Sequence, residues 1–210
     1  MPEPRISTNT NWIRLGASIA LISTIAACTP VITRFDVLSF KNPTGQELYS
    51  ESFPDGHYAV AANRNHVFTF QIAPREVLGA TDLSKAADAE FFQYVRVEIF
   101  WKPRPGTTYA DSSQTNANIT YCLINGRDSI TYEGAGFAYM SKSWDGKAFT
   151  GQIESATLVP THVMGEPTDL FGPCHLKGTF TAREDKLAVS KIEQKISRCR
   201  TTSTARLANP

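Results

Sequence analysis

The side chains that could carry out chemistry are few and widely spread in this sequence. Its four histidines are His57, His66, His162 and His175. Neither these nor the cysteines stand at the short spacings that hold a metal ion on one element, so we expect surface histidines and no metal site. The sequence also lacks a Gly-x-Ser-x-Gly elbow, a His-Glu-x-x-His motif and a phosphate-binding glycine loop. We therefore expect no cofactor.

Carboxylates are the remaining candidates for acid–base catalysis. Asp36, Asp128, Glu133 and Glu154 could form a catalytic pair only if the fold brought two of them together. Their positions in the sequence do not do so, and separate surface carboxylates are the default expectation. We name no catalytic residue, and an enzyme is the less favoured class.

The most specific motif is Ile25-Ala-Ala-Cys28, which follows an apolar stretch, Leu15–Ile25, and the basic residues Arg5 and Arg14. The stretch is shorter than the roughly 20 apolar residues of a membrane-spanning helix, but it suits the core of a signal peptide. The segment resembles a bacterial lipoprotein signal peptide. That resemblance implies cleavage before Cys28 and acyl chains on its sulfur; the alternative is an ordinary secretory signal cleaved near Ala27.

The resemblance also implies a location and a domain plan. The protein would be lipid-anchored in the bacterial cell envelope, with the membrane as its partner through Cys28. Thr29 stands where an Asp often marks inner-membrane retention in this family, so the outer membrane is favoured. We expect a signal peptide at 1–27, one β-rich domain at 28–199 and a flexible tail at 200–210.

Composition indicates a globular domain without a nucleic-acid-binding surface. Aromatic residues make up 10% and hydrophobic residues 41% of the chain, as in folded proteins. Of the 21 basic and 20 acidic residues, only Arg5, Arg14 and Glu3 lie in the leader, so the remaining charges balance. Balanced charge argues against nucleic acid as a partner.

Three cysteines remain if Cys28 carries lipid, and each of the three possible pairings leaves one thiol over. We expect a Cys122–Cys174 disulfide, because both residues fall in predicted strands. The alternative is Cys174–Cys199, since a helix folded back over the preceding strand would return Cys199 close to Cys174.

The rest of the chain has mostly strand patterns. Residues 92–101 alternate in a half-buried pattern, with one face made of Val95, Val97, Ile99 and Trp101 and the other of Tyr94, Arg96, Glu98 and Phe100. Before them we expect a short helix, capped by Thr81 or Asp82 and ending near Glu90. Asn125-Gly126 and Asp145-Gly146 predict two hairpins within a meander over 119–159, with a bulge or bend at 133–136 and a long loop at 160–173.

The second hairpin predicts a register in which Met140 faces Gly151 and Ala138 faces Ile153. Phe137 and Tyr139 then point to the opposite face. They are either covered by helix or loop residues, or they form an exposed aromatic strip that could bind a partner. One extra loop residue would exchange the two faces.

The chain is expected to end in a strand followed by an amphipathic helix. The strand begins at Cys174, and Thr181-Ala-Arg-Glu184 is a capping-box pattern. The apolar stripe of the helix consists of Val189, Ile192, Ile196 and Cys199. The predicted fold is an antiparallel β-sandwich, or alternatively a β-barrel, with this helix packed on one face.

These observations predict a membrane-anchored, non-catalytic binding or structural module of the envelope. The alternatives are an envelope hydrolase with an acidic site and a barrel that carries a lipid. The sequence does not identify the protein or small molecule that would be bound.

Overall fold

The computed structural model describes residues 32–42, 45–72, 91–103 and 114–204. The chain divides into Met1–Pro30 and Val31–Pro210, and every described residue belongs to the second unit. The described residues form nine strands and one helix: β1 Thr33–Ser39, β2 Glu47–Phe53, β3 Gly56–Val60, β4 His66–Ile72, β5 Phe91–Ile99, β6 Ala117–Asn125, β7 Asp128–Lys142, β8 Ala148–Met164, β9 Cys174–Glu184 and α1 Lys186–Thr204.

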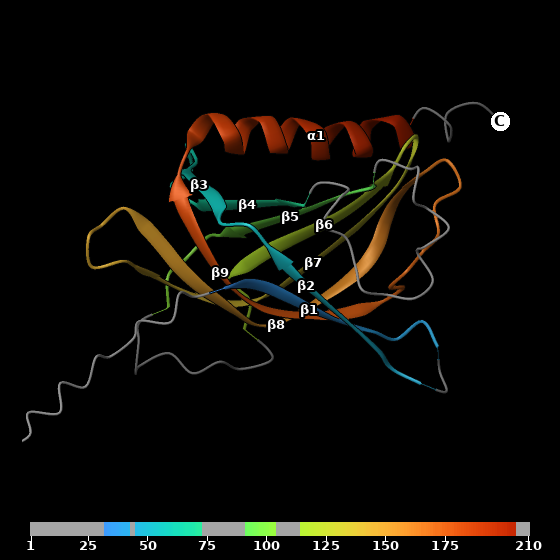
Figure 1. The fold of residues 1–210 in the computed structure, drawn as a ribbon, viewed down its shortest axis with the longest axis horizontal. Helices are drawn as coiled ribbons and strands as arrows, with labels where there is room; N and C mark the ends of the chain where they lie inside the picture. The colour runs from blue at the N-terminus through green and yellow to red at the C-terminus, as the bar shows by residue number, and fades with distance from the viewer. Residues whose placement is uncertain (1–31, 43–44, 73–90, 104–113, 205–210) are drawn as a thin grey trace, which may run out of the picture. The chain divides into compact units, whose positions relative to one another are not determined.

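All nine strands belong to one sheet that closes on itself. The strand order is β2-β1-β9-β3-β4-β5-β6-β7-β8, and β8 also pairs with β9. Strand β9 closes the ring because β8 pairs along one of its edges, while β1 and then β3 pair along the other. The β3–β9 pairing is parallel and the others are antiparallel. The mainly β fold with a C-terminal helix is confirmed, and the single ring is closer to the barrel alternative (Figure 1).

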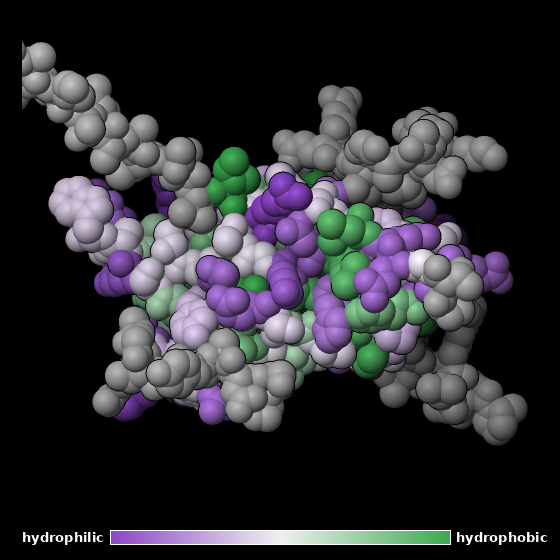
Figure 2. All heavy atoms as spheres, turned by 90° about the horizontal axis from the view of Figure 1, so that it is seen from below, coloured by the Kyte–Doolittle hydropathy of each residue, from purple (hydrophilic) through white to green (hydrophobic). Residues whose placement is uncertain are grey.

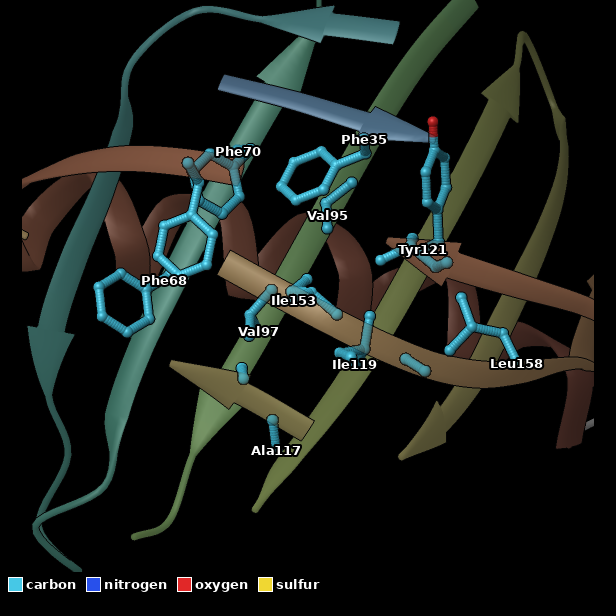
Figure 3. Packing of buried hydrophobic residues seen from close by; sticks show 14 of the residues in the cluster. Phe35, Phe68, Phe70, Val95, Val97, Ala117, Ile119, Tyr121, Ile153 and Leu158 are labelled. Carbon is cyan, nitrogen blue, oxygen red and sulfur yellow. The ribbon is translucent and has the colours of Figure 1, made fainter. Parts of the chain in front are cut away.

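The interior of the ring is filled by aromatic and aliphatic side chains (Figure 3). The Phe35 ring packs edge-on against Phe53 and Phe70, with centroids 5.2 and 5.1 Å apart. Burying each large apolar side chain contributes roughly 1.5–3 kcal/mol. In β5, Val95, Val97 and Ile99 face this core as expected. Trp101 does not, because β5 ends at Ile99 and the chain turns before it.

The predicted register of β7 and β8 is confirmed, since Met140 pairs with Gly151 and Ala138 with Ile153. The segment 133–136, where a bulge or bend was expected, lies inside one long strand, and register shifts flank it at 131/132 and 137/138. Glycine is required within it: a Cβ on Gly134 would lie 1.8 Å from the Thr157 carbonyl oxygen.

Two predicted boundaries were wrong. The first hairpin turns at Gly126-Arg127, between paired Asn125 and Asp128, and Gly126 has a positive φ. The loop expected at 160–173 begins only after Met164, because a register shift beside Pro160 accommodates the proline and lets β8 continue to pair with β7. His162 is therefore a strand residue. The short helix predicted to end near Glu90 and most of the loop after residue 103 lie outside the described residues.

Helix α1 lies on the outside of the ring (Figure 1). Its N-cap is Asp185, whose carboxylate accepts a hydrogen bond from the Ala188 amide at 2.8 Å. The predicted capping box at 181–184 was wrong, because β9 continues through Glu184. The predicted apolar stripe of α1 is buried. The helix reaches Thr204, so Arg200, expected in a flexible tail, is a helical residue.

Candidate functional site

The candidate site is a groove of about 670 Å³ between α1 and the outer faces of β5, β6 and β7. We call it the helix groove. Its charged and polar lining comes from alternate, outward-facing positions of the strands and from one side of the helix. It is lined by Arg96, Glu98, Asn118, Ile119, Thr120, Glu133, Gly134, Ala135, Glu193, Ile196, Ser197 and Arg200.

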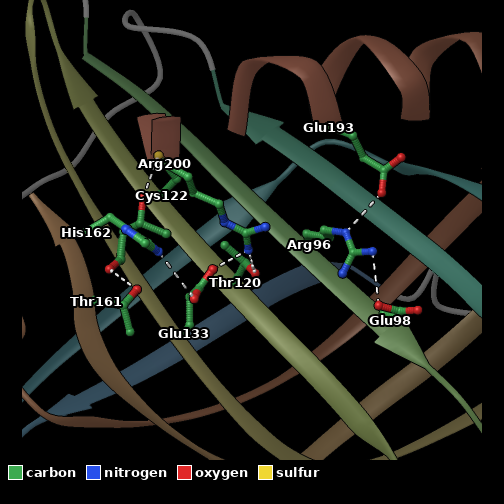
Figure 4. A network of polar contacts seen from close by, with 10 residues as sticks. Arg96, Glu98, Thr120, Cys122, Glu133, Thr161, His162, Glu193 and Arg200 are labelled. Atoms are coloured by element: carbon green, nitrogen blue, oxygen red, sulfur yellow. Dashed lines mark hydrogen bonds and ion pairs between the residues drawn. The ribbon is translucent and has the colours of Figure 1, made fainter. Parts of the chain in front are cut away.

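At one side of the groove, Arg96 joins the sheet to the helix (Figure 4). Its Nε donates to Glu193 Oε1 at 3.0 Å and its Nη2 to Glu98 Oε2 at 3.1 Å. Asn65 donates to the other oxygen of Glu98 at 2.7 Å. Burial by itself would raise the pKa of Glu98, but the Asn65 hydrogen bond and the Arg96 charge together lower it. Glu98 is therefore held as a carboxylate.

At the other side, Arg200 of α1 reaches down to the sheet. Its guanidinium forms an ion pair with Glu133 of β7 and donates to Thr120 Oγ1 at 2.9 Å. His162 Nε2 lies 3.8 Å from the second oxygen of Glu133 (Figure 4). The Arg200 Nε atom is buried and has no hydrogen-bond partner, so one donor in the groove wall remains unsatisfied.

The sequence pointed to only part of this site. Glu133 was one of the four candidate carboxylates, and the alternation of β5 placed Arg96 and Glu98 on its outer face. Arg200 was missed because it was assigned to the tail. One sequence signal could have placed it in the helix. Arg200 directly follows Cys199, the last residue of the apolar stripe, and the helix continues beyond that stripe.

The other candidate carboxylates lie elsewhere. Asp36 accepts a hydrogen bond from Arg34 Nε at 3.0 Å, and Asp128 accepts one from the Glu166 amide at 3.2 Å. Glu154 lines a separate groove together with Asp36. The structure thus brings none of these three into the helix groove with Glu133.

The cysteines face two different sides of the sheet. Cys174 belongs to the core inside the ring, whereas Cys122 and Cys199 belong to a second apolar cluster beneath α1. All three are buried free thiols. The expected Cys122–Cys174 pair, and the alternative Cys174–Cys199, are therefore not formed; each would have to join opposite faces of the sheet. Cys28, the predicted lipidation site, lies outside the described residues.

Of the two aromatic residues proposed as a binding surface, Phe137 is buried and Tyr139 is partly exposed. Phe137 is only 3% exposed, and its ring packs edge-on against Trp101 and Tyr139 at 5.9 and 5.0 Å. Trp101 adds exposed aromatic surface beside them. On the visible face away from α1, polar and apolar side chains are interspersed (Figure 2).

A second group of polar side chains, which sequence analysis missed, lies inside the ring. Tyr121 donates a hydrogen bond to Gln93, and both side chains are about 1% exposed. Glu51 is 8% exposed, and its Oε1 atom has no partner. Desolvation raises the pKa of Glu51 from 4.5 to about 7. The signal was the alternation of Tyr49, Glu51 and Phe53 in β2, which places Glu51 on the inward face.

Comparisons with protein-family models, curated proteins and solved structures found no match to this chain. Within the described residues, no three His, Cys, Asp or Glu side chains gather as a metal site would require. The same part of the chain contains no helix with the length and apolar character needed to cross a membrane.

Proposed function

We propose that this protein is a lipid-anchored, non-catalytic binding module of the bacterial cell envelope, with the helix groove as its ligand site. The Ile25–Cys28 segment supports the anchor, through its resemblance to lipoprotein signal peptides. The charge pairing in the helix groove is the observation that carries the binding role.

Charge pairing favours binding over acid–base catalysis. A general acid or base needs an ionisable group whose pKa is tuned towards the working pH. In the helix groove, Arg96 holds Glu98 and Glu193, while Arg200 holds Glu133. The pKa of Glu98 is lowered, which is opposite to the shift that a catalytic acid needs. An envelope hydrolase with an acidic site therefore gains no support from this groove.

The lining indicates the chemistry of the ligand. Two guanidinium groups and three carboxylates border the groove. A polar or zwitterionic ligand can exchange hydrogen bonds with both kinds of group, whereas an apolar one would leave them desolvated and unpaired. A lipid-carrying barrel is less favoured, because side chains fill the interior of the ring.

The anchor is tested by growing cells with a clickable fatty acid. We expect the wild-type chain to be labelled and to fractionate with membranes, and Cys28→Ala to lose both properties. Cys174→Ala is the matched control, because it removes a cysteine for which no lipid is proposed. Unchanged labelling and fractionation of Cys28→Ala would refute the anchor.

The groove is tested by titrating the detergent-solubilised chain with zwitterionic amino acids, amino sugars and glycerophosphodiesters. We expect at least one of these polar compounds to bind, and Ala135→Phe, which fills the groove, to weaken its binding at least tenfold. Ser52→Phe places the same ring on an exposed position of β2 and should leave affinity unchanged. A panel without any binder, or equal affinity of Ala135→Phe and wild type, contradicts the proposal.

A further inference from the structure

Two cysteines from distant parts of the chain meet beneath the C-terminal half of α1. Cys122 points outward from β6, and Cys199 points inward from the helix. They are 0% and 4% exposed and share one apolar cluster with Tyr94, Ile192 and Ile196. The apolar stripe of the helix therefore delivers Cys199 onto the strand that carries Cys122.

The two thiols are buried in the same cluster, and each shifts the pKa of the other. Thr131 donates to Cys122 Sγ at 3.6 Å, and Cys199 Sγ lies 3.4 Å from the Lys195 carbonyl oxygen. These contacts orient both sulfur atoms within the interface between α1 and the sheet. Cys174, on the inner face of the ring, is separated from them by the sheet itself.

We propose that Cys122 and Cys199 form a disulfide bond under oxidising conditions, which fastens the C-terminal end of α1 to β6. This pairing leaves Cys174 as the unpaired thiol. Where the bond forms in the cell depends on the proposed export, but the capacity to form it belongs to the fold.

The reaction requires an oxidant, and we name a small-molecule disulfide, called here the donor disulfide. The interaction with Cys122 lowers the pKa of Cys199, so Cys199 is the better nucleophile of the two. Its thiolate attacks the donor disulfide, forms a mixed disulfide and releases one donor thiol. Cys122 loses its proton, attacks the Cys199 sulfur and releases the second donor thiol. Two cysteine thiols are oxidised and one donor disulfide is reduced. Because both sulfurs are buried, the exchange occurs as α1 docks or when its end opens.

The test uses the full chain, first reduced and then incubated with oxidised glutathione. The sample is denatured, its free thiols are alkylated, and it is digested without reductant for mass spectrometry. We expect one linked pair of peptides containing Cys122 and Cys199, with Cys174 alkylated. Cys174→Ser should retain the link, and Cys122→Ser and Cys199→Ser should lose it. Reduction should lower the melting temperature of the wild-type chain by an amount on the order of 10 °C.

Several outcomes would overturn the proposal. They are a link from Cys122 or Cys199 to Cys174 or Cys28, glutathione left on one cysteine as the end product, or full alkylation of both cysteines. If a serine variant does not fold, the linked peptides found in the wild-type chain are sufficient to test the proposal. Because oxidation is carried out on purified protein, failure here leaves the lipid anchor and the groove unaffected, and their failure leaves this bond intact.

Discussion

The buried carboxyl group of Glu51 predicts how the stability of this protein depends on pH. Glu51 projects from β2 towards the core, and its Oε1 atom has no hydrogen-bond partner. Burial disfavours the charged form of an acid, so its pKa rises, here from 4.5 to about 7. Replacing Glu51 with glutamine keeps the shape of the side chain and removes this ionisation.

The sign of the effect follows from proton linkage. Between pH 4.5 and about 7 the folded chain still holds the Glu51 proton that the unfolded chain has released. The free energy of unfolding therefore falls as pH rises through this range. Above this range Glu51 adds no further pH dependence. A pKa change of this size lowers the free energy of unfolding by about 3 kcal/mol. Glu51→Gln has no ionisable group at this position and does not undergo this decrease. Its free energy of unfolding relative to wild type should therefore increase by about 2–4 kcal/mol between pH 4.5 and pH 8.

The assay is urea unfolding of wild type and Glu51→Gln at pH 4.5, 6 and 8, followed by tryptophan fluorescence. The difference between the two proteins at each pH isolates Glu51 from all other titrating groups. Glu154→Gln, the same change at a partly exposed position of β8, is the matched control. If the difference between wild type and Glu51→Gln stays constant within about 0.5 kcal/mol, the reasoning is refuted, since linkage requires it to vary.

Three further substitutions test the fold and the groove. Gly134→Ala should lower the free energy of unfolding in urea by about 1–3 kcal/mol, because its Cβ would overlap the backbone of β8. Gly45→Ala is the control and should have little effect, since open space surrounds this position. Equal losses of stability in the two variants would contradict this account. Asp185→Ala should cost about 1 kcal/mol by removing the N-cap of α1, and Asp185→Asn should largely retain stability; a loss as large in the asparagine variant would argue against capping. Arg96→Met should cost about 1–3 kcal/mol by leaving two carboxylates without their cation, as measured by thermal unfolding at low salt, and no loss would mean that these ion pairs do not hold α1 to the sheet.

Local sequence patterns were sufficient where a residue and its neighbours along the chain decide the outcome. Alternation identified the buried face of β5 over Val95–Ile99, and helical spacing identified the buried stripe of α1. The Asp145-Gly146 turn predicted the register of β7 and β8, because the side-chain period of two ties each pair to the turn between the strands. The mainly β fold and its C-terminal helix follow from these same local preferences.

The tertiary structure decided everything that depends on which strands become neighbours. Ring closure required β9 to pair with three strands at once, which no local pattern encodes. Because of strand pairing, β9 extends to Glu184 and β8 extends beyond Pro160. The N-cap of α1 is therefore Asp185. The sequence by itself predicted the alternating strands and the amphipathic helix, and the lipoprotein leader stays a prediction. Only the folded chain placed Cys122 against Cys199 and Arg200 against Glu133, because helix docking on a closed sheet joins residues far apart in sequence.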